Sequence, residues 1–448
     1  MDFLSVEWGR VVWDSSQWAD FPWESVMPLD QQWSRHPTFL IWEYVVFFNT
    51  ILSFVHAARN GSWYMTIWIA AFVAGTANDC FFMALNIVDN FWQAQATVML
   101  TPRLPLYICC TYNQFMYWAY VAAYNGPARW SLLQRSMAAG LLGELWYAPY
   151  DIAGAKFLWW TWHDTDASIR ERLFGAPCGS SIWVIIFTAW FFCLLNWSGA
   201  EHAESGSIHW KSGAWTVLIA SLAVVPMMIE HFISQVLVLS PGLPTVRALV
   251  VLIGVYCGTI FLGPSRTTPY QRLPEEGRGI SQVAAGMHFA VLVAVFVLGS
   301  PEAVVSSGVH QRIVDNGHDY ELDLTGALLQ TVGLNHSNYW RDKTLLRTAF
   351  DEQFTLDCVP AQAQGSQVSD MWYTVCGRSL DSAISHDTNL NSSLAYVLVQ
   401  GLIGFTGLVA LHVVRRWDEL GIRSTNRVAE YVRSLWRTFA GGAASKWD

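Results

Sequence analysis

The stretch SQVAAGMHFAVLVAVFVLGS, residues 281–300, contains no acidic residue, lysine or arginine and is long enough to cross a lipid bilayer. A membrane-spanning helix needs about 20 mostly apolar residues. Eight further stretches are also mostly apolar and about this long, namely 38–58, 63–85, 103–124, 130–148, 181–198, 213–237, 243–263 and 394–414. The sequence therefore predicts an all-α fold, a polytopic transmembrane helix bundle of about nine spans.

The composition agrees with a membrane protein, because 53% of the residues are hydrophobic and only 14% are charged, against about 25% charged in soluble domains. We divide the chain into a Trp-rich interfacial segment, a bundle of eight spans, one large hydrophilic loop, a last span and a basic amphipathic tail: 1–37, 38–300, 301–393, 394–414 and 415–448. The sequence contains no basic patch interleaved with aromatics, so no nucleic-acid partner is expected. The expected partner is the lipid bilayer, and the sequence leaves the oligomeric state and any cofactor open.

The charges of the tail predict the sidedness of the chain. Segment 415–448 is rich in arginine, and basic segments stay on the cytoplasmic side, so the C-terminus is expected in the cytoplasm and loop 301–393 outside. That loop is acidic and contains a glycosylation sequon at Asn335. Its two cysteines, Cys358 and Cys376, predict a disulfide in an oxidising compartment. These features favour the plasma membrane or a secretory-pathway membrane, where the loop could bind an extracellular partner.

Ionisable side chains at bilayer depth are pointers to function, because each costs from about 2.5 kcal/mol upward unless it is paired or hydrated. The predicted spans contain Glu43, Asp79, Glu144, Glu230, His231 and His288, together with the amides Asn78, Asn113 and Gln114. Any one of them could be a structural hydrogen-bond partner. Together they predict a polar interior between the helices.

The densest polar segment follows the fourth predicted span. It runs from Glu144 through Asp151 and Lys156 to the sequence WWTWHDTD, residues 159–166. Pro149 is expected to break the helix. If residues 155–167 resume as a helix, Trp159, His163 and Asp166 share one face.

This segment has two interpretations. The candidate catalytic residues are His163, Asp164 and Asp166, assisted by Glu230, His231 and His288, because carboxylates and imidazoles can bind a metal ion, transfer a proton or order water. The simpler interpretation is an interfacial helix with its tryptophans in the headgroup layer. No spacing completes a ligand set, so a metal remains open.

The same region resembles a eukaryotic family of multi-pass membrane proteins described only as a domain of unknown function. The resemblance is carried by PYDIAGAKFLWWTWHDTD (Pro149–Asp166), by Arg170, and by Gly175-Ala-Pro177 with Gly179-Ser180. It covers roughly residues 35–300 and implies a multi-pass membrane protein of no established activity. A fainter likeness is to membrane carotenoid-biosynthesis hydratases, from which no catalytic residue is carried over.

Three functions are compatible with these observations. The first is a structural or receptor-like membrane component whose polar core groups only specify packing. The second is a membrane enzyme acting on a lipid or isoprenoid, with His163, Asp166 and one of the later polar residues in one pocket. The third is a proton- or ion-coupled transporter, with Asp79, Glu144 and Glu230 along its path. Against the third, the sequence has no recognisable inverted repeat and no paired broken helices.

Overall fold

The structure is a computed structural model, and it describes residues 23–84, 91–162, 171–238, 245–264 and 279–299. It also describes shorter pieces at 169, 276–277, 304–309, 312–314, 344–346, 372–376, 398 and 401. The helices in these ranges are α1 (Leu29–Arg35), α2 (Pro37–Asn60), α3 (Ser62–Ala84), α4 (Leu106–Tyr124), α5 (Leu132–Lys156), α7 (Cys178–Ser205), α8 (Trp210–Ser221), α9 (Val224–Val238), α10 (Thr245–Leu262) and α11 (Gly279–Leu298). The chain is therefore mostly helical, as predicted.

Local sequence explains where several helices begin and end. Helix α2 begins with Pro37, whose fixed φ suits the first turn and whose missing N–H is not needed there. It ends before Gly61, which has a φ of +98°. Helix α5 is preceded by Ser131, which forms a reciprocal capping box with Gln134. These signals set the helix ends, whereas burial of the faces sets how the helices pack.

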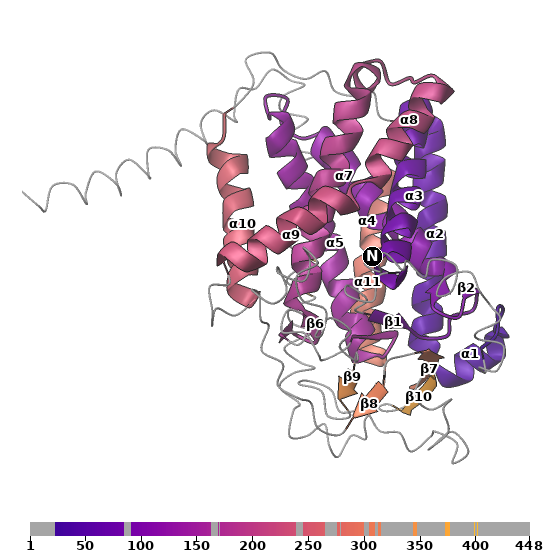
Figure 1. Cartoon of the computed structure of the whole chain (residues 1–448). Coiled ribbons are helices and arrows are strands. Elements are labelled where there is room, and N and C mark those ends of the chain that lie inside the picture. The colour runs from indigo at the N-terminus through magenta and orange to yellow at the C-terminus, as the bar shows by residue number, and fades with distance from the viewer. Residues whose placement is uncertain are drawn as a thin grey trace, which may run out of the picture.

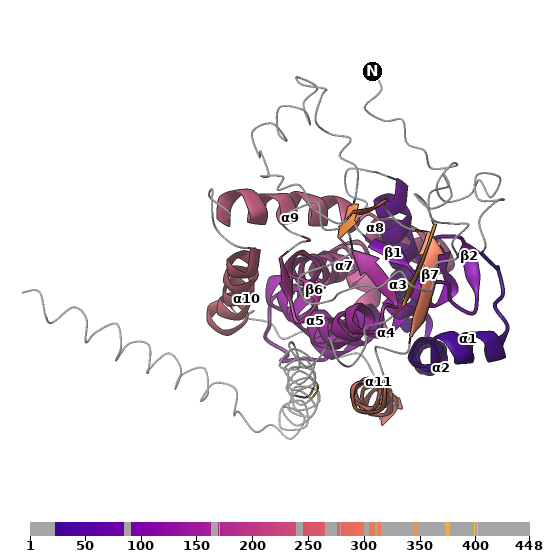
Figure 2. The same cartoon turned by 90° about the horizontal axis from the view of Figure 1, so that it is seen from below.

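Helix α4 lies at the centre of the bundle. It contacts α2, α3, α5 and α7, and the view along the bundle shows these helices around it (Figure 2). All but two of its 19 residues are buried. Helices α2, α4 and α7 lead away from the lower end in Figure 1, and α3 and α5 return to it. The centre of the molecule is thus built by helices that also carry many polar residues.

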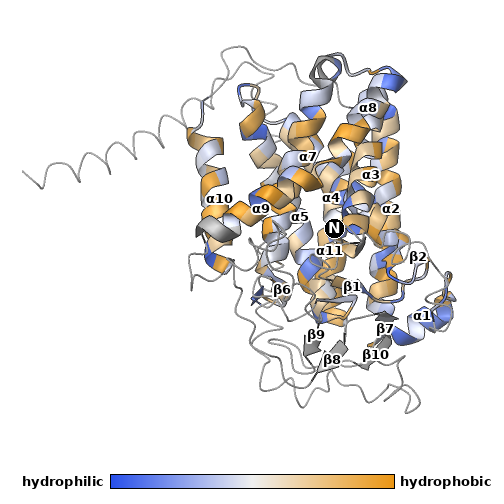
Figure 3. Cartoon of the chain, viewed as in Figure 1, coloured by the Kyte–Doolittle hydropathy of each residue, from blue (hydrophilic) through white to orange (hydrophobic). Residues whose placement is uncertain are grey.

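Six helical segments in the described part of the chain are long and apolar enough to cross a membrane, which indicates an integral membrane protein. They are Pro37–Asn60, Ser62–Met83, Cys178–Gly199, Trp210–Ser234, Thr245–Leu262 and Gly279–Leu298. Their outward surfaces are apolar (Figure 3), with exposed side chains such as Val250 and Leu298. The figure of nine spans is not confirmed.

The three remaining predicted spans differ in their outcome. Helices α4 and α5 occupy two of them but are not among the six apolar segments, because they hold more polar side chains. The third, 394–414, is described only at Leu398 and Gly401. A Cβ at Gly401 would lie 3.3 Å from the ring of Phe289 in α11, so Gly401 lies beside α11.

Short strands gather at the lower end of the bundle, which the all-α prediction did not include (Figure 1). They are β1 (Phe91–Gln93), β2 (Met99–Thr101), β3 (Leu104–Pro105), β4 (Trp160–Trp162), β5 (Arg172–Leu173), β6 (Ala176–Pro177), β7 (Val305–Val309), β8 (Arg312–Val314), β9 (Thr344–Leu346) and β10 (Trp372–Cys376). They form two-stranded ladders β1–β4, β2–β3, β5–β6, β7–β10 and β8–β9, of which β8–β9 is parallel.

Two local expectations were wrong. Pro149 does not end a helix, because α5 continues through it to Lys156. Packed neighbours make this tolerable, since adjacent helices can satisfy the backbone group that proline frees. Residues 157–162 do not resume as a helix either, because Trp160–Trp162 form strand β4 and pair with Phe91–Gln93, and residues 163–167 lie outside the described ranges.

The N-terminal segment packs against the polypeptide that follows β1. Met27 N–H donates to Thr97 O at 2.9 Å, and Gln32 Nε2 donates to Gln95 O at 3.1 Å. Residues 1–22 lie outside the described ranges. Helix α1 therefore contacts protein through defined hydrogen bonds, in addition to any contact with the membrane surface.

Candidate functional site

Asp79 lies on a buried face of α3, near its lower end. The hydroxyl of Tyr112 in α4 donates to Asp79 Oδ1 at 2.5 Å. Asn78 Nδ2 lies 3.5 Å from the same hydroxyl, and Trp183 Nε1 of α7 donates to Asn78 Oδ1 at 3.3 Å. The second carboxyl oxygen of Asp79, Oδ2, has no hydrogen-bond partner. Three helices thus position this carboxyl and leave one of its oxygens unused.

Two more carboxyls lie on the buried face of α5. Ser180 of α7 donates its hydroxyl hydrogen to Asp151 Oδ2 at 2.5 Å, and Tyr147 lies within electrostatic range of Asp151. Glu144 is 9% exposed and lies near Ser181. Asp151 Oδ1 and Glu144 Oε2 have no hydrogen-bond partner. Both side chains therefore leave one carboxyl oxygen unused, as Asp79 does.

These carboxyls form one group, which we call the carboxyl core: Asp79, Glu144 and Asp151 with Tyr112 and Tyr147. Tyr147 lies within electrostatic range of both Asp79 and Asp151, and Asp151 lies within that of Glu144. Within the described ranges, Asp79 and Asp151 bond hydroxyl and amide groups rather than basic side chains. The core is acidic, buried and without a positive counter-charge among these partners.

The described ranges hold no group of three His, Cys, Asp or Glu side chains placed to bind a metal ion. Asp79 and Asp151 accept hydrogen bonds from the hydroxyls of Tyr112 and Ser180, respectively, and Tyr147 lies within electrostatic range of both. The geometry suits proton exchange, since a tyrosine hydroxyl can both donate and accept a hydrogen bond.

A cluster of aromatic rings, which we call the aromatic cap, adjoins the carboxyl core in the sequence, because Tyr150 directly precedes Asp151. The cap consists of Trp42, Tyr150, Trp159 and Trp160. The ring of Trp42 stacks on Trp159 with centroids 5.6 Å apart and on Tyr150 at 5.3 Å, and Trp160 lies 4.7 Å from Tyr150. Gly154 makes the close approach of Trp160 possible, because a Cβ there would lie 2.1 Å from the indole ring.

His36 joins the entry to α2 to the aromatic cap. Its Nε2–H donates to Leu158 O at 3.3 Å, and its ring lies edge-on to Phe39. Burial lowers the pKa of His36 from its ordinary 6.5 to about 4, although hydrogen bonds to Leu158 and Phe157 act in the opposite direction. The neutral imidazole is therefore the form that fits this position.

We expect the stability of the protein to fall as the pH falls from 6.5 to 4. In this window the unfolded chain protonates His36 while the folded protein does not, so stability present above pH 6.5 is lost, by about 3 kcal/mol at most. The variant His36→Gln keeps an N–H for Leu158 O but does not titrate. Thermal melting of the purified protein across this range should show a steeper decline for wild type than for His36→Gln, and parallel curves would contradict the assignment.

Glu230 lies elsewhere, between α7, α9 and α10. Trp190 Nε1 donates to Glu230 Oε2 at 2.6 Å, and the hydroxyl of Tyr256 donates to Oε1 at 3.1 Å. Its neighbour His231 is half-buried on α9. Glu230 shares no hydrogen-bond partner with Asp79 or Glu144 in the described part of the chain, and the predicted transport path through all three stays a prediction.

His288 of α11 lies beside the aromatic cap. Its Nε2 lies 2.8 Å from Trp146 O, and its ring centroid is 5.0 Å from that of Trp42 and 4.8 Å from that of Trp146. It shares no hydrogen-bond partner with Glu230 in the described part of the chain. The two candidates thus occupy separate environments.

Several candidates lie outside the described residues and stay predictions: His163, Asp164, Asp166, Asn335 and Cys358. Cys376 lies in β10 opposite Val305 of β7. The predicted disulfide, the glycosylation site and the cytoplasmic placement of the C-terminus therefore remain predictions as well.

Sequence reasoning missed the residues that connect the carboxyls. Tyr112, Tyr147 and Ser180 were not singled out, because a tyrosine near a helix end resembles an interfacial anchor and a serine gives no signal. The spacing of polar residues along α5 was a signal that could have found Tyr147. Glu144, Tyr147 and Asp151 follow one another at three and four residues, which places them on one helix face.

A family model described as Domain of unknown function (DUF7802) matches residues 7–399. Comparison with curated proteins and with solved structures gives no match. The likeness to carotenoid-biosynthesis hydratases therefore has no support beyond the sequence pattern.

Proposed function

The chain belongs to the DUF7802 family, and from its carboxyl core we propose that it is a proton-coupled membrane transporter. The observation that carries the proposal is the convergence of Asp79, Glu144 and Asp151, each with one unbonded oxygen. An ionised carboxylate at this depth is costly without a counter-charge or water, whereas a protonated carboxyl has no charge to bury. The carboxyl core can therefore exclude water while its carboxyls are protonated. The carboxyls would release their protons when the core opens to water.

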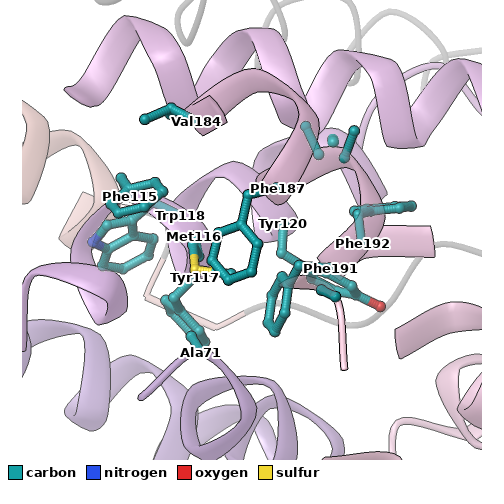
Figure 4. Packing of buried hydrophobic residues seen from close by; sticks show 14 of the residues in the cluster. Ala71, Phe115, Met116, Tyr117, Trp118, Tyr120, Val184, Phe187, Phe191 and Phe192 are labelled. Carbon is teal, nitrogen blue, oxygen red and sulfur yellow. The ribbon is translucent and has the colours of Figure 1, made fainter. Parts of the chain in front are cut away.

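The residues around the core support a closed state. The aromatic cap adjoins it in the sequence, and rings including Phe115, Trp118 and Phe187 pack tightly in the bundle (Figure 4). Tyr112 and Tyr147 lie beside the carboxyls. Protons can therefore be exchanged inside the core while the bundle around it stays packed.

A broken helix gives further support. The apolar segment Trp210–Ser234 contains two helices, since α8 ends at Ser221 and α9 begins at Val224. Transporters use discontinuous helices to bind and release their cargo. Glu230 lies in the second half of this segment, where it is bonded to α7 and α10.

The enzyme hypothesis has less support. It needs His163 and Asp166 beside at least one of Glu230, His231 or His288, and His163 and Asp166 lie outside the described residues. The structural hypothesis does not account for three buried carboxyl oxygens without partners, because a group that only specifies packing is expected to have its hydrogen bonds satisfied.

We expect vesicles that contain the protein to take up protons when an inward pH gradient is combined with a cargo. The experiment uses the purified full chain, an entrapped pH-sensitive dye and fractions of a small-molecule cell extract. Asp79→Asn and Asp151→Asn should reduce uptake to the level of empty vesicles. Glu230→Gln is the matched control, because this carboxyl also lies in the membrane but outside the core, and it should retain uptake.

Two outcomes would contradict the proposal. Either no fraction produces uptake above that of empty vesicles, or the two Asn variants transport protons as wild type does. Chemical change of the vesicle lipids by wild type, detected by mass spectrometry without proton uptake, would favour the enzyme hypothesis instead.

A further inference from the structure

Two amide side chains in the bundle have no hydrogen-bond partner at all. Asn49 of α2 is 0% exposed and Gln114 of α4 is 1% exposed, and the oxygen and nitrogen of both amides lack partners. Neighbouring Asn113 differs, because its Nδ2 donates to Trp68 O at 2.7 Å. Buried polar groups in proteins are nearly always bonded to protein or to ordered water. These amides therefore need a ligand.

Both amides lie where α2 meets α4. The two helices run in the same direction (Figure 1) and are joined by Thr50 Oγ1, which donates to Cys110 O at 3.2 Å. Asn49 precedes Thr50, and Gln114 is one turn beyond Cys110. At 1.5 Å per residue, the two amides are about one turn, roughly 6 Å, apart along the bundle.

Helical spacing also places them on the contacting faces. His56 Nδ1 lies 2.7 Å from the hydroxyl of Tyr117, which joins α2 to α4 above the two amides. Asn49 is seven residues before His56, and Gln114 is three residues before Tyr117, so each shares a face with the residue that makes this contact. Asn49 is also four residues before Ser53, whose hydroxyl accepts from Trp68 Nε1 at 3.0 Å.

The chemistry of the amides selects the ligand. Each offers two N–H donors and one oxygen acceptor, so the ligand must both donate and accept hydrogen bonds. It must also be small and neutral, since the surrounding side chains Ser53, Cys110 and Thr50 carry no charge. We propose that Asn49 and Gln114 bind ordered water inside the membrane-spanning bundle.

This site goes beyond the proposed function and does not depend on proton transport. Gln114 lies two residues beyond Tyr112 on α4, so the two side chains are on different faces of that helix, and the water site is separate from the hydroxyl that binds Asp79. Loss of proton uptake without loss of this water, or the reverse, would separate the two proposals.

Radical footprinting of the purified full chain tests the site, because X-ray pulses convert bound water into hydroxyl radicals that oxidise adjacent side chains. Cys110 is the reporter. Cys109 is the matched control, since it is also buried but lies one residue before Cys110, which places it about 100° around helix α4 from the reporter. We expect faster oxidation of Cys110 than of Cys109 in wild type, and loss of that difference in Gln114→Leu and in Asn49→Leu.

Thermal melting gives a second measurement on the same variants. Leucine has nearly the same size as these side chains but lacks the polar amide atoms. It should therefore raise the melting temperature of the protein if the amides bind nothing and lower it if they bind water. The proposal would be overturned if Cys110 were not oxidised faster than Cys109 in wild type. It would also be overturned if both leucine variants kept that difference. Higher melting temperatures in both variants would overturn it as well.

Discussion

Replacing Gly75 with alanine is expected to destabilise the protein by about 3 kcal/mol or more and to disrupt the carboxyl core, because forced overpacking of a tight core costs about 1–3 kcal/mol and sometimes more. A Cβ on Gly75 would lie 1.9 Å from Cγ and 2.5 Å from Cβ of Tyr112. These atoms are at the root of the side chain, so a rotamer change cannot move them away. Helices α3 and α4 would have to separate.

The same displacement should affect function, because the hydroxyl of Tyr112 donates to Asp79. Gly286→Ala is the matched control, since Gly286 lies in the apolar helix α11 and nothing is within 4 Å of its added Cβ. Alanine there should be neutral or stabilising by up to about 1 kcal/mol, from helix propensity. Thermal melting and proton uptake of both variants check this, and equal behaviour of the two would contradict the packing of Tyr112 on Gly75.

The helices could be predicted from the sequence because each is a local pattern. Continuous apolar runs located α2, α3, α7, α10 and α11 to within a few residues. Their arrangement was not predictable, since an apolar run does not show which neighbour each face contacts. Strand β4 was missed for a related reason. It has three residues and pairs with β1, nearly 70 positions earlier, so nothing near it in the sequence indicates a strand.

The candidate site was predicted in part. The cost of burying charge selected Asp79 and Glu144, which belong to the carboxyl core, and it also selected Glu230, which shares no hydrogen-bond partner with them in the described residues. This rule carries no information on how each helix is rotated about its own axis, so it cannot show which carboxyls face one another. It also does not select neutral side chains, and Tyr112 and Tyr147, the tyrosines of the carboxyl core, are neutral.

The turn between α4 and α5 is held by a buried positive charge on Arg135, which no pattern in the sequence indicated. Arg135 is 1% exposed. Its guanidinium donates to the carbonyl oxygens of Tyr124, Trp130 and Pro127, and it lies 5.2 Å from the ring centroid of Tyr124. Tyr124 ends α4, where unpaired carbonyls carry partial negative charge. Arg135 therefore holds the end of the central helix to the start of α5.

We expect Arg135→Ala to destabilise the protein by about 3 kcal/mol or more, because several charge-assisted hydrogen bonds are lost and buried carbonyls are left without donors. Arg135→Lys keeps the charge, but an ammonium cannot match the planar fork of the guanidinium, so it should recover less than half of the loss. Arg129→Ala is the matched control. Arg129 is exposed in the same connection, and its loss should change stability by about 0.5 kcal/mol at most.

Thermal melting of the three variants distinguishes a specific guanidinium contact from a general need for positive charge. Full rescue by lysine would show that charge alone suffices, and a wild-type melting temperature for Arg135→Ala would show that the turn does not depend on this side chain. Because α4 and α5 together carry Tyr112, Glu144, Tyr147 and Asp151, a loosened turn should also reduce proton uptake in the variants that melt early. A variant that melts early yet transports normally would mean that the carboxyl core keeps its geometry independently of the opposite end of the bundle.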